Sequence, residues 1–166
     1  VTIKELMSKI DKFNIPKEVS CVTKTLENAG FEAYIVGGCV RDLLIGKTPK
    51  DWDVTTNAKP EEIENLFENT FYNNDYGTVG VVNEDTEDGT LKVVEVTPYR
   101  LESEYSDSRR PDSVEFSDSI EHDLKRRDFT INAIAYNESK GQIIDLHEGQ
   151  KDIDSKTVRA IGDPDV

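Results

Sequence analysis

The sequence predicts an α+β fold: a mixed, mainly antiparallel sheet of about five strands with helices on one face. Three observations support this class. Short apolar runs bounded by turn residues are typical of strands. Between the first runs lie segments whose apolar residues recur every three or four positions, as in helices. The second half of the chain is mostly strand-like, with turn signals that favour hairpins over repeated strand–helix–strand units.

The first elements alternate between helix and strand. Residues Pro16–Gly30 form a predicted helix, because their apolar side chains share helical spacing and the final glycine closes the C-terminus. The apolar run Ala33–Val36 ends at Gly37-Gly38, which predicts a buried strand. Val40–Ile45 is then a short helix.

The next strand carries an alternating pattern. In "DWDVTT", residues 51–56, Trp52 and Val54 fall on one face, and Asp51 and Asp53 fall on the other. A helix follows in residues 58–67, which have a proline near the first turn, then glutamates, then apolar residues on one side.

The remaining elements are mainly strands. Asp88-Gly89 marks a turn between the predicted strands Thr78–Val82 and Leu91–Thr97. Tyr99–Ser113 is predicted to be a long loop. Residues 119–137 contain an interrupted helix that leads into a strand at residues 133–136, and Gln142–Leu146 is its expected hairpin partner. The tail has a short helical stretch and a short apolar strand, Val158–Ile161.

Composition restricts the class of protein. The chain has 166 residues, which suits one domain. Its net charge of −14 argues against a broad nucleic-acid-binding surface but suits a site that holds divalent metal. No apolar run approaches the roughly 18 residues that span a bilayer, and no signal peptide is evident. With only two cysteines, we expect a reduced, cytoplasmic protein without membrane partners.

A glycine pair at the end of the first strand is the first candidate binding feature. Gly37-Gly38 lets the backbone approach a ligand and directs the free N–H groups of the next helix at an anion. Arg41 lies on the first turn of that helix and can reach the same anion. The pair alone is more typical of a tight strand–helix turn beside a surface arginine than of a binding site. Neither a dinucleotide fingerprint nor a P-loop is present in the sequence, which argues against a dinucleotide-binding oxidoreductase.

Two carboxylates make the second feature. Asp51 and Asp53, two residues apart on a strand, point the same way and lie roughly 7 Å apart along it. They can therefore converge on a pair of cations about 3.5–4 Å apart, as two-metal phosphoryl chemistry requires. Such pairs are also common on exposed strands, so the metal site depends on the glycine turn being nearby.

A third feature is the stretch "RRDFTINA", residues 126–133. Arginine can hold phosphate with two hydrogen bonds, and aspartate and asparagine can bind ribose hydroxyls. Taken alone, the stretch is equally a helix start with Asp128 as its cap and with Arg126 and Arg127 solvated.

Together these motifs resemble one known family. "VGGCVRDLLIGKTPKDWDVTTNAKPEEI", residues 36–63, and "RRDFTINA" are similar to the signatures of the nucleotidyltransferase superfamily that includes DNA polymerase beta. Within it, they resemble the class that contains tRNA CCA-adding enzymes and bacterial poly(A) polymerases. The resemblance extends from about Lys17 to Val166 and implies the catalytic head of that architecture.

The resemblance implies an enzyme and a set of site residues. The implied reaction transfers a nucleotide from CTP or ATP to the 3′-hydroxyl of RNA, most typically the tRNA 3′ end, with Mg²⁺ as cofactor and Mn²⁺ as an alternative. Adding A alone, poly(A) synthesis and a non-catalytic nucleotide-binding module remain as alternatives. The implied metal ligands are Asp51 and Asp53, with Glu95 as a further catalytic carboxylate; the implied nucleotide-binding residues are Gly37, Gly38, Arg41, Arg127, Asp128 and Asn132.

The resemblance also predicts what lies outside this domain. The chain does not start with Met, and we expect residues 1–166 to be the head domain of a longer protein, without the neck, body and tail regions. In the family a neck motif, Glu-Asp-x-x-Arg, selects the base, so we expect this chain alone to be weakly active or inactive. Residues 105–116 resemble a flexible loop of the family, in which Arg109 and Arg110 either contact nucleic acid or are solvated.

Overall fold

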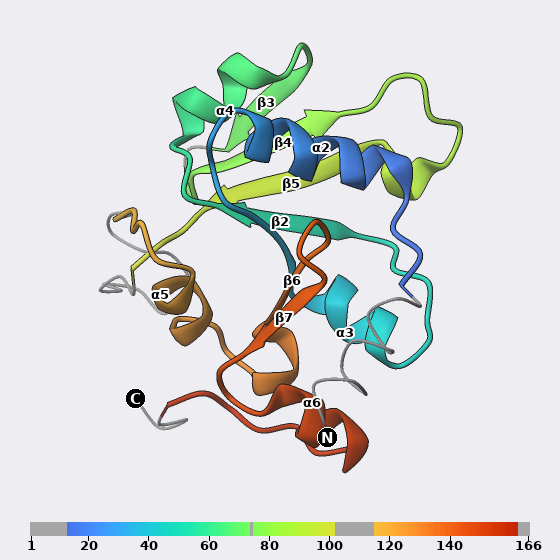
Figure 1. Ribbon diagram of the computed structural model, residues 1–166, viewed down its shortest axis with the longest axis vertical. Helices are drawn as coiled ribbons and strands as arrows, with labels where there is room; N and C mark the ends of the chain where they lie inside the picture. Colours follow the sequence, from blue (N-terminus) through green and yellow to red (C-terminus); the bar gives the residue numbers. More distant parts are fainter. Residues whose placement is uncertain (1–12, 74, 102–114, 163–166) are drawn as a thin grey trace.

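The computed structural model describes residues 13–73, 75–101 and 115–162 of the chain. At its centre lies one seven-stranded sheet in the order β3-β4-β5-β2-β1-β6-β7 (Figure 1). Neighbouring strands are antiparallel except β2 and β5, which run parallel. The predicted mixed, mainly antiparallel sheet is confirmed, with seven strands in place of about five.

The strands are β1 (Ala33–Val36), β2 (Trp52–Thr56), β3 (Thr70–Asn73), β4 (Thr78–Val82), β5 (Val93–Pro98), β6 (Ile134–Asn137) and β7 (Gln142–Asp145). The helices are α2 (Lys17–Asn28), α3 (Gly38–Leu44), α4 (Pro60–Leu66), α5 (Ile120–Lys125) and α6 (Gly149–Asp154), with 3-10 turns η1 (Gly89–Leu91) and η2 (Thr130–Asn132).

Two of the strands differ from the sequence prediction. Strand β3 was not expected, because its four residues are mostly exposed and form no apolar face that a sequence pattern would reveal. The apolar strand expected at Val158–Ile161 does not form. Ala160 makes only an isolated bridge to Phe129, and the side chain of Val158 is 68% exposed, so this segment has no buried face to hold it against a sheet.

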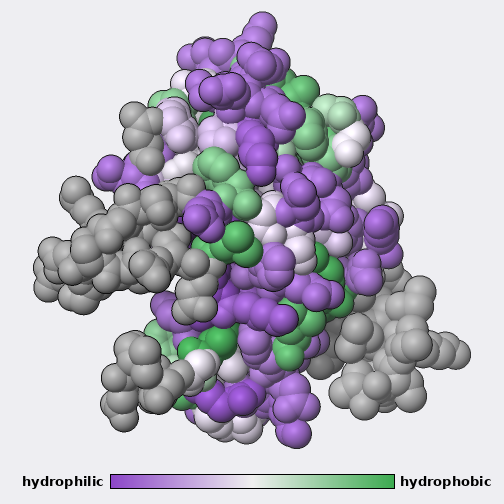
Figure 2. Space-filling view, turned by 90° about the vertical axis from the view of Figure 1, so that its left-hand side faces the viewer, coloured by the Kyte–Doolittle hydropathy of each residue, from purple (hydrophilic) through white to green (hydrophobic). Residues whose placement is uncertain are grey.

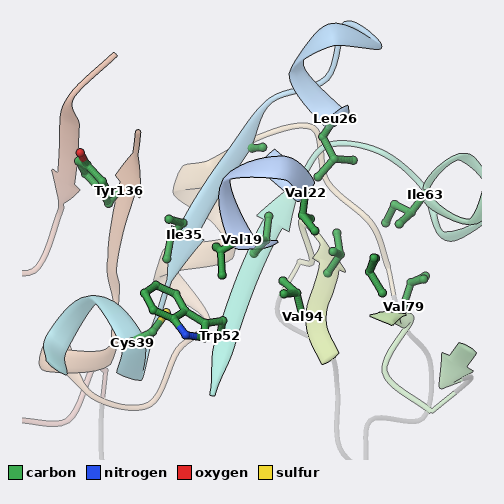
Figure 3. Packing of buried hydrophobic residues seen from close by; sticks show 14 of the residues in the cluster. Val19, Val22, Leu26, Ile35, Cys39, Trp52, Ile63, Val79, Val94 and Tyr136 are labelled. Carbon is green, nitrogen blue, oxygen red and sulfur yellow. The ribbon is translucent and has the colours of Figure 1, made fainter. Parts of the chain in front are cut away.

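The main core lies between one face of the sheet and helices α2, α3 and α4 (Figure 3). The amphipathic face of α2 packs there because its apolar residues recur at helical spacing. Trp52 is 3% exposed and belongs to this core. Because side chains alternate along a strand, Asp53 points to the opposite face. The core members named in Figure 3 are Val19, Val22, Leu26, Ile35, Cys39, Trp52, Ile63, Val79, Val94 and Tyr136.

A second apolar cluster, to which helix α5 contributes, covers part of the opposite face of the sheet. Leu124 of α5 packs there with Tyr34 and Val36 of β1. The reason is visible in β1, where all four residues are buried and therefore both faces need cover. Helix α5 has few apolar positions, and its place could not be inferred from periodicity.

At least one face of the molecule is mainly hydrophilic. Hydrophilic residues dominate the face seen in Figure 2, in keeping with the 33% of residues that are charged. Among the described helices, none has the length and apolar character needed to cross a membrane. Most of the predicted long loop Tyr99–Ser113, including Arg109 and Arg110, lies outside the described residues.

Candidate functional site

A cavity of about 340 Å³ lies on the face of the sheet that Trp52 does not occupy. Asp53 of β2 and Glu95 of β5 lie directly opposite each other in the parallel pair, and both line the cavity. Three arginines also line it: Arg100, which follows β5, and Arg126 and Arg127, which follow α5. The full lining is Val36, Asp53, Val54, Asn73, Tyr76, Thr78, Glu95, Thr97, Arg100, Arg126 and Arg127. The cavity is therefore lined by a pair of carboxylates and by three positively charged arginine side chains.

The two carboxylates interact unfavourably when both are charged. Burial of Asp53, followed by the hydrogen bond and the negative charge of Glu95, raises the pKa of Asp53 to about 7, although the charge of Arg127 opposes this. Asp51 adds a smaller effect in the same direction. A bound cation would offset the remaining repulsion between these two carboxylates.

The donor chemistry of this pair fits Mg²⁺. Carboxylate oxygens are the ligands that this hard cation prefers, and it usually takes one or two of them together with phosphate oxygens and water. Across residues 13–73, 75–101 and 115–162, no three His, Cys, Asp or Glu side chains form a complete metal-binding group. Asp53 and Glu95, with Asp51 nearby, therefore suit a cation that arrives with a phosphate ligand.

The carboxylate pair gives a testable dependence of stability on pH. The folded-state pKa of Asp53, about 7, lies above the value of about 4 for an unfolded aspartate, so folding loses stability as pH rises from about 4 to 7. Replacing Glu95 with glutamine removes the negative charge beside Asp53. We expect the free energy of unfolding of Glu95→Gln to exceed that of the wild type by on the order of 1 kcal/mol at pH 8 and by less at pH 5.

Chemical denaturation at pH 5, 6, 7 and 8 measures this difference. Glu87→Gln is the matched control, because Glu87 is an exposed glutamate outside the sheet. A stability difference for Glu95→Gln that stays constant across the four pH values would contradict the interpretation.

The Gly37-Gly38 turn lies beside two of the residues that line the cavity, Asp53 and Arg127. Gly37 precedes α3 with φ of 86°, a left-handed conformation that favours glycine. A Cβ atom at Gly37 would lie 3.5 Å from Nη1 of Arg127 and 4.0 Å from Oδ2 of Asp53. Tertiary structure thus brings together three motifs that are far apart in sequence.

Arg41 lies beside this turn. Its Nη2 atom would be 3.3 Å from a Cβ atom at Gly38, so the guanidinium folds back over the start of α3. Its Nη1 donates to Oδ1 of Asn132 at 2.7 Å, and its Nη2 forms an ion pair with Oδ1 of Asp42 at 3.1 Å. Arg41 and Asn132 are therefore already fixed against each other next to the turn.

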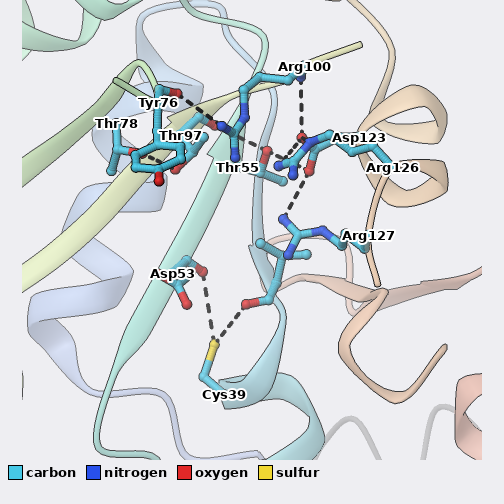
Figure 4. Close-up of polar contacts among 11 residues, drawn as sticks. Cys39, Asp53, Thr55, Tyr76, Thr78, Thr97, Arg100, Asp123, Arg126 and Arg127 are labelled. Carbon is cyan, nitrogen blue, oxygen red and sulfur yellow. Dashed lines mark hydrogen bonds and ion pairs between the residues drawn. The ribbon is translucent and has the colours of Figure 1, made fainter. Parts of the chain in front are cut away.

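A buried carboxylate, Asp123, organises the arginines and was missed from the sequence (Figure 4). Its side chain is fully buried and forms ion pairs with Arg126 at 2.9 Å and Arg127 at 3.1 Å. Burial alone would raise the pKa of Asp123, but the charges of Arg127 and Arg126 outweigh it and hold the pKa below its usual value. The spacing of three and four residues on a helix was the available signal. The arginines are thus not simply solvated.

Of the predicted residues, Asp53, Glu95 and Arg127 line the cavity, and two of the others, Asp51 and Asp128, lie apart from the arrangement. Asp51 precedes the first residue of β2 and is exposed, so it does not share the strand geometry expected for it. Asp128 is also exposed, and its Oδ1 accepts a hydrogen bond from the N–H of Phe129 at 2.8 Å. The structure brings together Gly37, Asp53, Glu95, Arg127 and Asn132, with Gly38 and Arg41 adjacent.

Comparison with known proteins gives a consistent result. Residues 33–159 match the protein family described as the poly A polymerase head domain. The chain is 48% identical over 149 residues to the CCA-adding enzyme of Enterococcus faecalis, covering 89% of this chain and 35% of that protein. It is 50% identical over 146 residues to the CCA-adding enzyme of Leuconostoc citreum, covering 87% of this chain and 34% of that protein.

Solved structures agree with the sequence comparisons. The Bacillus stearothermophilus CCA-adding enzyme in complex with CTP superposes with a TM-score of 0.74 at 38% identity, over 88% of this chain and 33% of that one. A tRNA nucleotidyltransferase complexed with a primer tRNA and an incoming ATP analog gives a TM-score of 0.65 at 30% identity, over 85% of this chain and 39% of that one. The chain spans about a third of the length of the curated relatives it matches.

Proposed function

Because the chain belongs to the family of the poly A polymerase head domain, we propose that it is the catalytic head of an RNA nucleotidyltransferase. Its proposed reaction transfers a nucleotide from CTP or ATP to the 3′-hydroxyl of RNA and releases pyrophosphate. The tRNA 3′ end is the proposed acceptor, since the relatives described above are CCA-adding enzymes. Those relatives favour CCA addition over poly(A) synthesis.

One observation carries this proposal: a single cavity holds paired carboxylates and arginines. The anionic triphosphate suits Arg127 and the N–H groups that follow Gly37. The carboxylate pair suits the cation that accompanies a triphosphate. Arg41 and Asn132, already joined by a hydrogen bond, are placed to hold phosphate and ribose beside the turn. We assign Asp128 to the ribose as well, which requires its exposed side chain to turn from the N–H of Phe129.

Each group contributes a distinct part of the chemistry. Asp53 and Asp51 would hold Mg²⁺ or Mn²⁺, with Glu95 as the neighbouring carboxylate. A bound cation would neutralise phosphate charge and lower the pKa of the attacking 3′-hydroxyl. Gly38 and Arg127 would orient the phosphates, because their donors are fixed before the ligand arrives, whereas Gly37 shapes the turn and donates its own N–H to the carbonyl oxygen of Ile134 at 3.3 Å.

Binding of triphosphates to this chain tests the first half of the proposal. We expect Mg²⁺-dependent binding of both CTP and ATP by isothermal titration calorimetry, with little discrimination between the two, because we place base selection outside this domain. NADH serves as a control ligand that the site is not expected to bind. If CTP and ATP bound equally well with and without Mg²⁺, the proposed metal site would be wrong.

Transfer itself is tested in a chimera. This chain replaces the matching third of the Enterococcus faecalis CCA-adding enzyme, to which it is 48% identical. We expect the chimera to add labelled CMP and then AMP to a tRNA that lacks its 3′-terminal nucleotides. A chimera that folds and transfers neither CMP nor AMP would contradict the proposed activity.

A further inference from the structure

Asp123 lies at the centre of a hydrogen-bond network that joins three parts of the chain (Figure 4). Oδ1 accepts from Nε and Nη2 of Arg126 at 3.1 and 2.9 Å and from the backbone N–H of Arg100 at 3.3 Å. Oδ2 accepts from Nη2 of Arg127 at 3.1 Å, and Oγ1 of Thr55, 3.2 Å away, shares its one proton between Oδ2 and the carbonyl oxygen of Thr97 at 3.1 Å. Both oxygens of a fully buried carboxylate are therefore used.

We propose that Asp123 is a positioning residue that holds Arg126 and Arg127 in place as a preformed clamp for the triphosphate. This rests on the proposed function, because it assigns the occupant of the cavity. Asp123 itself does not line the cavity, whereas both arginines do. It acts through them.

The geometry of Arg127 shows how this works. One nitrogen, Nη2, is held by Asp123, and the other, Nη1, lies at the glycine turn, 3.5 Å from where a Cβ atom of residue 37 would be. Since the guanidinium is planar and rigid, fixing one nitrogen fixes the direction of the other. Asp123 therefore directs Nη1 at the turn that precedes α3.

The network also ties the arginines to the carboxylate strand. Thr55 lies on β2, two residues after Asp53, and points to the same face. Through Thr55, Asp123 sets the position of the arginines relative to Asp53. The side chain of Arg127 is 18% exposed, so it loses most of its hydration and relies on Asp123 for compensation. Without Asp123, two neighbouring guanidinium groups would repel each other and separate.

Inorganic tripolyphosphate is the probe, because it tests the clamp without a base, a ribose or added metal. We expect Asp123→Asn to weaken tripolyphosphate binding at least about tenfold and to affect inorganic phosphate much less. The direction of the change in affinity is informative, because removing a negative charge would by itself strengthen the binding of an anion. Glu121→Gln is the matched control: it removes one charge from an exposed position on the same helix.

A double-mutant cycle separates positioning from general stabilisation. If Asp123 acts through Arg127, then Asp123→Asn changes tripolyphosphate affinity much less in an Arg127→Ala background than in the wild type. Equal effects in the two backgrounds, or unchanged or tighter binding by folded Asp123→Asn, would overturn the proposal.

The same measurements distinguish this inference from the proposed function. If Asp123→Asn weakens tripolyphosphate binding but Mg²⁺-dependent CTP binding is absent in the wild type, the clamp stands and the metal chemistry does not. Should Asp123→Asn fail to fold, Thr55→Val removes one donor to Asp123 and is expected to weaken tripolyphosphate binding about two- to threefold. Unchanged binding by folded Thr55→Val would then overturn the proposal.

Discussion

Asp53→Asn is expected to abolish Mg²⁺-dependent binding of CTP and ATP and to lower nucleotide transfer by the chimera about 10³-fold or more. Asp53 is the one residue of the predicted metal pair that lies in the cavity, and it faces both Glu95 and the glycine turn. An asparagine keeps the shape of the side chain but provides no charge to a divalent cation. Calorimetry with and without Mg²⁺ measures the loss of binding, and primer extension measures the loss of transfer.

The stability of this variant provides its control. Ionised Asp53 is destabilised by burial and by Glu95, so its replacement is expected to leave the melting temperature unchanged or raised at pH 8. A loss of binding in a protein that is at least as stable cannot be attributed to unfolding. Asp53→Asn that still bound CTP in a Mg²⁺-dependent manner would show that other residues hold the cation.

Gly149→Ala is expected to have the largest effect on stability, about 2–3 kcal/mol or more. Gly149 is buried at the start of α6, and a Cβ atom there would lie 2.2 Å from the carbonyl oxygen of Thr130 and 2.9 Å from its carbonyl carbon. Backbone atoms cannot move aside as a flexible side chain can, so either α6 or η2 must shift. Thermal unfolding measures the loss.

The displacement would also reach the candidate site. Thr130 and Asn132 belong to the same turn, η2, and Asn132 accepts the hydrogen bond from Arg41. We therefore expect weaker CTP binding as well. Gly89→Ala is the matched control, because a Cβ atom at Gly89 meets nothing within 4 Å. Equal melting temperatures for the two variants would mean that α6 is not packed against η2 as described.

Local sequence patterns located most of the secondary structure. Strand β1 has the predicted bounds, and the hairpin of β6 and β7 forms as expected. These elements are short, strongly apolar and bounded by glycines or polar turns, so each carries its own signal. Strand β3 carries none, because it is an edge strand whose pairing with β4 comes from the backbone and not from an apolar face.

The sequence by itself determined the candidate features of the site: a glycine turn, a pair of aspartates and an arginine-rich stretch, each recognisable because its pattern is a local spacing. Only the tertiary structure decided which of these meet. The sequence predicted Asp51 as the second carboxylate beside Asp53. The parallel pairing of β2 with β5 instead places Glu95 opposite Asp53. Burial of Asp123 under Arg126 and Arg127 depends on α5 packing on the face opposite the main core. Contacts of this kind join residues far apart in the chain, and they exist only once the sheet has formed.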